Sequence, residues 1–174
     1  SVRNECKELL FVVEREADGR EPLVRCINFG LDGMQSFSFT LEEERSAVLV
    51  PAGQVGTYLY EPNASVLKAG AFKQIAVRTG VKKLQVNSHL YTADHLVSDF
   101  PGRRFRVDEV LSFTGKLCKG LSKTIPQANI TVRNFPLSVE ELRKRTKITD
   151  GGHVYLFATT LVDGEKVLVK CSKA

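Results

Sequence analysis

A strand pattern joined directly to a capped helix, in residues 128–147, constrains the fold more than any other stretch of this sequence. Residues 130–132 are β-branched, an Asn-Phe-Pro break follows, and Ser138 with Glu141 has the spacing of a capping box. The helix that follows has two apolar residues on one face and ends in a run of basic residues. Cations in the last turn suit the helix dipole. The stretch therefore predicts a strand, a turn and a helix that buries its apolar face.

Strand and helix patterns also follow one another through the rest of the last two thirds of the chain. Residues 153–161 and 166–171 are rich in Val and Leu and flank an Asp-Gly pair, which predicts a closing β-hairpin. Residues 104–113 begin with alternating basic and apolar side chains, as a half-buried strand does, and residues 64–78 have apolar residues at helical spacing. Shorter patterns predict a strand at residues 57–60, a strand or an irregular run at residues 81–91, and a helix at residues 116–123. This order predicts an α+β fold with a mixed, largely antiparallel sheet and helices packed on it.

The first part of the chain predicts a small connector that contains a β-hairpin. Residues 7–14 and 22–29 are strand-like and flank the turn signal Asp18-Gly19. An isolated hairpin is marginally stable, so we expect another part of the protein to complete its sheet. Residues 36–40 alternate as a further strand, and residues 41–47, with three Glu near their start, predict a short helix.

The charge is distributed unevenly on the two sides of a linker, PAGQVG, at residues 51–56. Residues 1–55 contain six Lys or Arg against ten Asp or Glu, a net charge of −4, and residues 56–174 contain nineteen against ten, a net charge of +9. We take these two segments as a connector and a second domain. A small domain with a charge of +9 indicates a polyanionic partner, most often nucleic acid.

The composition argues against a membrane, a metal site or a disulfide scaffold. No apolar run approaches the ~20 residues that span a bilayer, and no signal peptide is present, so we expect a cytoplasmic protein without membrane contact. The cysteines, which we expect to be reduced and mostly buried, are Cys6, Cys26, Cys118 and Cys171. Neither they nor the three histidines have the close spacing of metal ligands. The chain also opens without Met in a strand-like pattern, so we expect it to be part of a longer protein.

Catalytic motifs fail when they are tested one by one. The sequence has no P-loop, no dinucleotide-binding glycine fingerprint and no G-x-S-x-G nucleophile elbow. The Asn-Phe-Pro-Leu segment at residues 134–137 differs in residue order from the Asn-Pro-Pro-aromatic loop of amino-group methyltransferases. His89 and Asp94 have no further groups around them that would make an acid–base pair. We therefore predict no catalytic, cofactor-binding or metal-binding residue in this chain.

Four blocks of sequence support a resemblance to a known family. They are YLYEPNASVLKAGAF at residues 58–72, NSHLYT at 87–92, FPGRRF at 100–105, and residues 128–147. Together they resemble the THUMP-like C-terminal domain of bacterial class I S-adenosylmethionine-dependent methyltransferases, in the form found in Bacteroidetes-type bacteria. Residues 4–29 are similar to the ferredoxin-like or hairpin connector that this family places after its methyltransferase core.

The resemblance implies that the catalytic domain and its S-adenosylmethionine site lie upstream of this chain. THUMP domains proper bind RNA in RNA-modifying enzymes, which implies tRNA or rRNA as a partner, together with the chain's own N-terminal methyltransferase domain. Combined with the charge, it gives a set of residues expected to contact RNA: Arg103, Arg104, Arg106, Arg133, Arg143, Lys144, Arg145 and Lys147. Tyr91, Phe105 and Phe135 are candidates for base stacking, although burial is favoured for the last two.

Two function hypotheses remain open from the sequence. The first is a non-catalytic RNA-recognition part of an RNA methyltransferase. The alternative is a structural or oligomerisation domain of the methyltransferase that does not contact nucleic acid. An independent small enzyme has no supporting group of residues.

Overall fold

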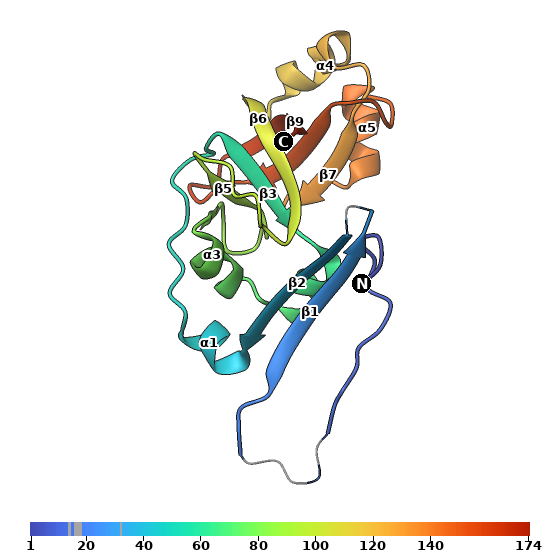
Figure 1. The fold of residues 1–174 in the computed structure, drawn as a ribbon. Helices are drawn as coiled ribbons and strands as arrows, with labels where there is room; N and C mark the ends of the chain where they lie inside the picture. The colour runs from blue at the N-terminus through green and yellow to red at the C-terminus, as the bar shows by residue number, and fades with distance from the viewer. Residues whose placement is uncertain (14, 16–18, 32) are drawn as a thin grey trace.

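A large mixed sheet and a separate β-hairpin form the framework of the protein (Figure 1). The computed structural model describes residues 1–174 except 14, 16–18 and 32. In this described part the strand order of the large sheet is β4-β5-β3-β6-β9-β8-β7. Its strands are β3 (Tyr58–Pro62), β4 (Lys82–Lys83), β5 (Tyr91–Ala93), β6 (Gly102–Ser112), β7 (Asn129–Arg133), β8 (Tyr155–Thr160) and β9 (Lys166–Lys173). Adjacent strands are antiparallel except β7 and β8, so the α+β class and the mixed, largely antiparallel sheet are confirmed.

The N-terminal hairpin uses a different pair of strands from the predicted one. β1 (Leu23–Gly30) pairs with β2 (Gly33–Thr40), while residues 7–13 form no strand; Glu14 and Asp18 of the prediction lie outside the described residues. The reason is one-sided burial: alternate residues of β1 and β2 are buried, so pairing them creates a common buried face. The continuous apolar run of residues 7–13 offers no such alternation.

The predicted helix at residues 64–78 consists of two short helices, α2 (Ala64–Ala69) and α3 (Gln74–Thr79). Gly70 ends α2 in the left-handed conformation, with φ of 77°, which favours glycine. The first backbone N–H groups of α3 are bound by a residue outside the helix, since the Glu44 carboxylate accepts hydrogen bonds from Lys73 N at 2.9 Å and Gln74 N at 2.8 Å. The sequence pattern identified the apolar face and missed the break.

The other predicted helices are confirmed, and two of them begin with a complete capping box. α1 (Leu41–Ser46) has Thr40 and Glu43 as the box, and α5 (Val139–Thr146) has the predicted Ser138 and Glu141. α4 (Gly115–Thr124) begins at Thr114, whose hydroxyl accepts a hydrogen bond from Leu117 N. The predicted closing hairpin is confirmed as the antiparallel pair β8–β9.

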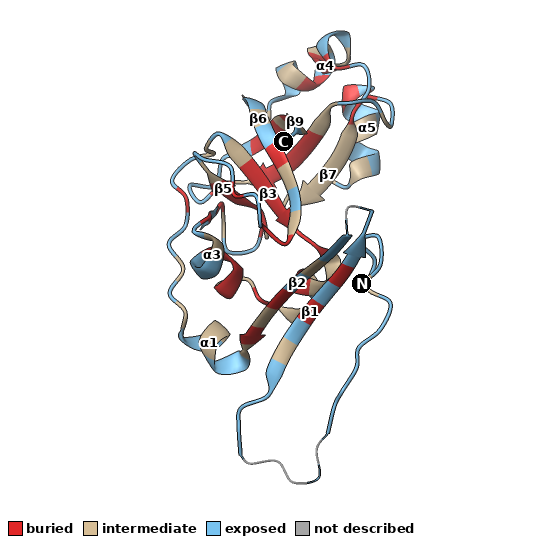
Figure 2. Cartoon of the chain, viewed as in Figure 1, coloured by how far each residue is buried: buried red, intermediate tan, exposed pale blue. Residues whose placement is uncertain are grey.

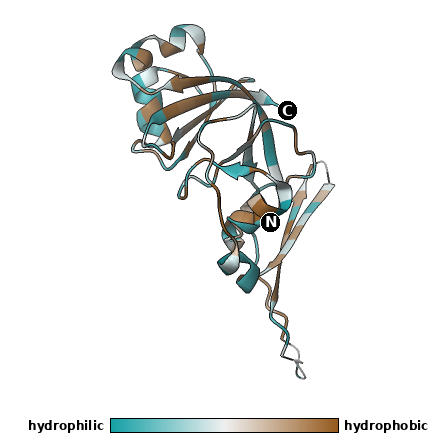
Figure 3. Ribbon diagram, turned by 90° about the vertical axis from the view of Figure 1, so that its left-hand side faces the viewer, coloured by the Kyte–Doolittle hydropathy of each residue, from teal (hydrophilic) through white to brown (hydrophobic). Residues whose placement is uncertain are grey.

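Three hydrophobic clusters hold these elements together (Figure 2). α4 and α5 cover one face of the large sheet, where Leu121 and Leu142 pack with Leu156 and Leu168. A second cluster lies on the opposite face around Phe105 and Phe157. The third joins the hairpin to the rest of the chain: Phe37 and Phe39 share it with Tyr60, Tyr91 and Phe100. Figure 3 shows hydrophobic residues along the long strands of the large sheet.

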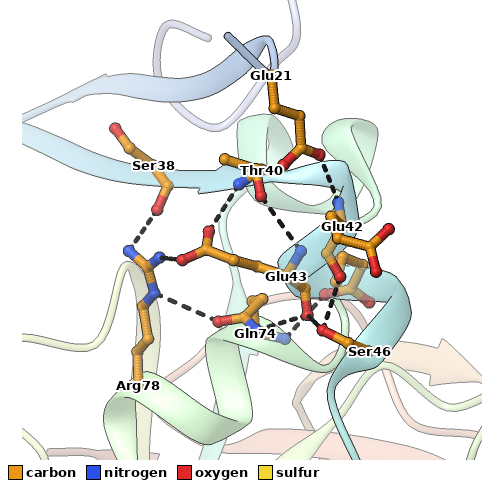
Figure 4. A network of polar contacts seen from close by, with 9 residues as sticks. Glu21, Ser38, Thr40, Glu42, Glu43, Ser46, Gln74 and Arg78 are labelled. Atoms are coloured by element: carbon orange, nitrogen blue, oxygen red, sulfur yellow. Dashed lines mark hydrogen bonds and ion pairs between the residues drawn. The ribbon is translucent and has the colours of Figure 1, made fainter.

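A polar network fixes the far end of the hairpin to α3 (Figure 4). The Arg78 guanidinium donates to the Ser38 carbonyl at 2.5 Å, to Glu43 at 2.7 Å and to Gln74 at 3.3 Å. Gln74 in turn donates to the Glu43 carbonyl at 2.7 Å. β2, α1 and α3 are thereby linked through one arginine. No helix in the described ranges is both long enough and apolar enough to cross a membrane.

Candidate nucleic-acid interface

Two of the predicted arginines meet at one buried carboxylate. Glu61 in β3 is 2% exposed and accepts hydrogen bonds from Arg103 Nε at 2.8 Å and from Arg133 Nη2 at 2.9 Å. Arg103 lies directly opposite Glu61 on β6, the favourable position for a cross-strand ion pair. Arg133 comes from β7, an edge strand that lies four positions from β3 in the sheet.

The contact between Glu61 and Arg133 shows that the large sheet curls on itself. β6, β9 and β8 separate β3 from β7, so a flat sheet with strands ~4.8 Å apart would hold them roughly 19 Å from each other. The 2.9 Å ion pair therefore needs a strongly curved sheet. Its concave face carries both arginines on the side of Phe105 and Phe157.

Two further basic residues, Lys83 and His89, pack against the ring of Phe72. Lys83 is 3% exposed, and its Nζ lies 4.9 Å from the ring centre of Phe72 while donating to the Val86 carbonyl at 2.7 Å. Burial lowers the pKa of Lys83 from 10.5 to about 8. His89 stacks on Phe72 with 3.8 Å between ring centres, and burial, reinforced by the charges of Lys83 and Arg133, lowers its pKa to about 4. His89 is therefore neutral at physiological pH.

Three buried polar atoms among the described residues have no hydrogen-bond partner. They are His89 Nδ1, Arg133 Nε and Thr159 Oγ1. Thr159 on β8 lies opposite Arg133 on β7, so at least two of them are on neighbouring strands. Buried polar atoms in proteins usually have a partner, often ordered water.

The predicted cluster of Arg103, Arg104 and Arg106 is divided between the two faces of β6. Arg103 shares its face with Phe105, and its guanidinium carbon lies 5.4 Å from the centre of that ring. Arg104 and Arg106 alternate to the opposite face, where Arg104 donates to the Ser98 carbonyl. Arg106 is exposed.

The basic end of α5 is likewise divided into a structural arginine and exposed cations. Arg143 forms an ion pair with Asp150 and donates to the carbonyls of Ala128 and Ile148, which holds the end of the helix to β7. Lys144, Arg145 and Lys147 are exposed, and in the described part of the chain their side chains form no hydrogen bond or ion pair. α4 packs beside α5 and adds Lys116, Lys119 and Lys123 to this end of the molecule.

The predicted stacking residues are mostly inaccessible. Tyr91 is fully buried, Phe105 is 1% exposed, and Phe135 packs edge-on against Phe113 with 5.0 Å between ring centres. The sequence reading missed Tyr155, which is half-buried and packs against Phe105 at 4.9 Å. Its place in an apolar strand pattern gave no sign that the ring borders a cavity.

Two cavities meet at Tyr155 and Lys173. The larger has a volume of about 550 Å³ and lies between the turn of the hairpin, the N-terminal residues and the start of β6. The smaller, of about 380 Å³, is bordered by Gly152, His153 and Ser172. Among the described residues no group of three or more Cys, His, Asp or Glu is placed to hold a metal ion.

Family comparisons agree with the resemblance found in the sequence. Residues 58–101 match a ferredoxin-like domain, and residues 102–173 match a family described as THUMP domain-like. Residues 58–173 are thus similar to a ferredoxin-like domain followed directly by a THUMP-like domain. The boundary between the two matches falls just before β6. Because β6 pairs with β3 of the first match, the two matched segments share one continuous sheet.

A solved structure provides the more particular likeness. The chain is similar to the crystal structure of a putative methyltransferase from Porphyromonas gingivalis W83, with a TM-score of 0.83 and 47% sequence identity. The match covers 87% of this chain and 38% of that one. No curated protein matches the sequence. The ferredoxin-like match lies at residues 58–101, whereas the sequence placed a ferredoxin-like connector at residues 1–55, and the division at residues 55 and 56 stays a prediction.

Proposed function

We propose that this chain is the non-catalytic RNA-recognition part of an S-adenosylmethionine-dependent RNA methyltransferase. The THUMP-like match and the similarity to a putative methyltransferase support an RNA-modification role. The relative is more than twice as long as this match, so the proposal places the methyltransferase domain and its S-adenosylmethionine in another part of a longer cytoplasmic protein. tRNA or rRNA is the proposed partner.

The observation that carries the proposal is the exposed cationic end of α5. Lys144, Arg145 and Lys147 sit on a helix that is fixed at its start by a capping box and at its end by Arg143. Among the described residues none of the three forms an ion pair, although the charges of Lys144 and Arg145 help to lower the pKa of the Glu141 carboxyl one turn earlier. A rigid cationic surface is suited to the phosphates of structured RNA, which proteins read mainly by shape and backbone.

Of the other residues predicted to contact RNA, some are exposed and some are held in ion pairs. Arg106 is exposed, whereas Arg103 and Arg133 share the Glu61 carboxylate and Arg143 is engaged with Asp150. We propose that α5 makes the main phosphate contacts and that Arg143 acts by positioning the helix. The other predicted contacts remain proposals of the same kind.

Fluorescence anisotropy with labelled tRNA over a salt series tests this function. The test variant is Lys144→Glu/Arg145→Glu, and the matched control is Arg15→Glu/Arg25→Glu, which makes the same charge change at two exposed residues of the N-terminal segment and hairpin. The α5 variant should bind roughly tenfold more weakly at low salt and with a smaller salt slope, because each lost phosphate contact removes ~0.7–0.9 from it. If both variants lose the same tRNA affinity, the loss follows from the change in net charge, and α5 has no special role in binding.

A second function has one observation in its favour. The apolar run at residues 9–13 and the open face of the hairpin expose several large hydrophobic side chains, including Phe11 and Phe29. Large exposed apolar patches often mark protein contacts. If tRNA binding is absent even at low salt while the protein self-associates, the structural or oligomerisation role becomes the better description.

A further inference from the structure

The 550 Å³ cavity beside the hairpin, which we call the hairpin cleft, has the size and lining of a small-molecule site. Its described border comes from the N-terminal residues Arg3 and Asn4, from the hairpin, from Asn63, from the starts of β6 and β8, and from the last residues of the chain at the end of β9. Its volume falls in the range of ~300–1,000 Å³ typical of ligand pockets. The hairpin cleft is formed by segments that are far apart in the sequence, so the fold must be intact for it to exist.

Side-chain amides lock the polar wall of the hairpin cleft. Gln35 Oε1 accepts hydrogen bonds from Asn63 Nδ2 at 3.0 Å and from Asn28 Nδ2 at 3.3 Å, and Gln35 Nε2 donates to the Gly102 carbonyl at 3.4 Å. Asn4 is held as well, because its Oδ1 accepts a hydrogen bond from Ala64 N at 2.7 Å. This network ties the hairpin and the N-terminal residues to the start of α2 and to β6. The cleft is therefore a preorganised feature of the fold.

Cationic residues gather around this wall. Arg3, Arg103 and Lys173 line the hairpin cleft together with Arg104, whose side chain points to the other face of β6, and no lining residue that the structure describes is an Asp or Glu. Glu61 balances part of the charge on Arg103, and one Nη of Arg104 is bound to the Ser98 carbonyl. The side chains of Arg3 and Lys173 form no hydrogen bond or ion pair with any described residue.

The backbone at Arg3 is held in an unusual conformation. Arg3 has φ of 48° and Asn4 has φ of 63°, both in the left-handed region. Their N–H groups are fixed to the hairpin, Arg3 N to the Phe29 carbonyl at 2.8 Å and Asn4 N to Asn28 Oδ1 at 3.3 Å. The left-handed region is unfavourable for a residue with a Cβ atom such as arginine, so the surrounding bonds must maintain it. The same bonds keep Arg3 at the edge of the hairpin cleft.

An aromatic ring completes the site. Tyr155 borders both the hairpin cleft and the smaller cavity, and Phe105 supports its ring from one side at a ring-centre distance of 4.9 Å. Bases stack favourably on aromatic rings, and this stacking does not depend strongly on which base it is. Planar guanidinium groups bind phosphates through paired hydrogen bonds. One aromatic platform beside several cations matches the two chemical parts of a nucleotide.

We propose that the hairpin cleft binds one nucleotide unit, with its phosphate held by Arg3, Arg103 and Lys173 and its base placed against Tyr155. The chemistry is that of a nucleoside phosphate, either free or as a nucleotide in a single-stranded RNA segment. The inference rests on the proposed function only for the second of these sources. It adds a site on the opposite side of the sheet from the α5 surface.

Titration calorimetry of the whole chain with AMP, adenosine and inorganic phosphate tests the chemistry. AMP should bind more tightly than either adenosine or phosphate, because only AMP uses both halves of the site. Amide resonances of Arg3, Tyr155 and Lys173 should shift in a ¹H–¹⁵N spectrum as AMP is added. No AMP binding at millimolar concentration, or shifts that map only to α5, would overturn the proposal.

Paired variants separate the two halves. Lys173→Gln should weaken AMP and phosphate alike by at least about threefold, whereas the control Lys166→Gln, at the other end of β9, should leave both within twofold. Tyr155→Leu should weaken AMP at least about fivefold and leave phosphate unchanged, and Tyr155→Phe, which keeps the aromatic ring, should bind AMP as the natural protein does. Equal AMP affinity of Tyr155→Leu and Tyr155→Phe would contradict the stacking role.

The source of the nucleotide is tested with a short single-stranded RNA. The probe is a single-stranded RNA trinucleotide. If it binds more tightly than AMP and competes with AMP, the occupant is a nucleotide of an RNA chain. If the two affinities are equal, the occupant is a free nucleotide. Both results support the hairpin cleft. tRNA binding that depends on α5 without any AMP binding would retain the proposed function and reject this site.

Discussion

Glu61 is the residue on which two distant strands depend, because its single carboxylate serves both Arg103 and Arg133. Glu61→Gln keeps the shape but leaves two guanidinium groups without their counter-charge. Removing one partner of a buried ion pair destabilises a protein by ~3–5 kcal/mol, and the half-exposed arginines reduce this to roughly 1–3 kcal/mol here. Urea denaturation should show this loss, with the exposed Glu109→Gln on β6 as control. Equal midpoints for the two variants would show that the arginines are solvated well enough without Glu61.

Lys83 gives the protein a distinctive pH dependence of stability. Its pKa is about 8 in the folded protein, mainly because of burial and in spite of the nearby Glu44, and near its ordinary value of 10.5 when unfolded. Between these pH values the unfolded chain binds more protons than the folded one, so the contribution of Lys83 to stability rises with pH. The difference in unfolding free energy between the natural protein and Lys83→Met should therefore shift in favour of the natural protein from pH 8 to pH 10. The control variant Lys82→Met, at the exposed neighbour, should show no such change with pH. If the unfolding free energies of the two variants depend on pH in the same way, the prediction is wrong.

At the scale of elements, the capped helix α5 supports the proposed interface. Ser138 Oγ accepts a hydrogen bond from Glu141 N at 3.2 Å, and Glu141 accepts one from Ser138 N at 2.7 Å, which lowers the pKa of that carboxyl. Ser138→Ala should lower the unfolding free energy by about 1 kcal/mol and speed hydrogen exchange in the first turn of α5. Ser36→Ala, at an exposed serine of β2, is the matched control for loss of a hydroxyl. If the two variants are equally stable, the box contributes nothing measurable.

Elements with a local signal were predictable from the sequence, and those set by long-range pairing were not. The Ser138–Glu141 box and the Asp163-Gly164 turn are written in neighbouring residues, and both are confirmed. The sequence has two Asp-Gly pairs near its start, and only packing against α2 and α3 decides that β1 pairs with β2. Likewise the charges of Arg103 and Arg133 were visible, but the curled sheet that joins them at Glu61 was not.

At the scale of the whole molecule, the acidic residues 1–55 and the basic residues 56–174 are joined through a shared core. Phe37 and Phe39 of the hairpin are buried with Tyr60 and Tyr91 of the second segment, and Arg78 links the same parts by polar contacts. The linker pattern at residues 51–56 marked a change in composition. It could not show that chain segments on its two sides fold onto each other.

One surface segment stands apart from this core, the exposed apolar run at residues 9–13 (Figure 2). Leu10 is 83% and Val12 87% exposed, so Leu10→Ser/Val12→Ser should change the unfolding free energy by less than ~0.5 kcal/mol per site. A contiguous apolar run with high β-propensity favours pairing between chains, so the natural protein should self-associate with increasing concentration and the variant should do so much less. Sedimentation velocity over a concentration series measures this. Val48→Ser/Val50→Ser, which removes two exposed valines outside the run, should leave the association unchanged, and a natural protein that stays monomeric at all concentrations would refute the prediction.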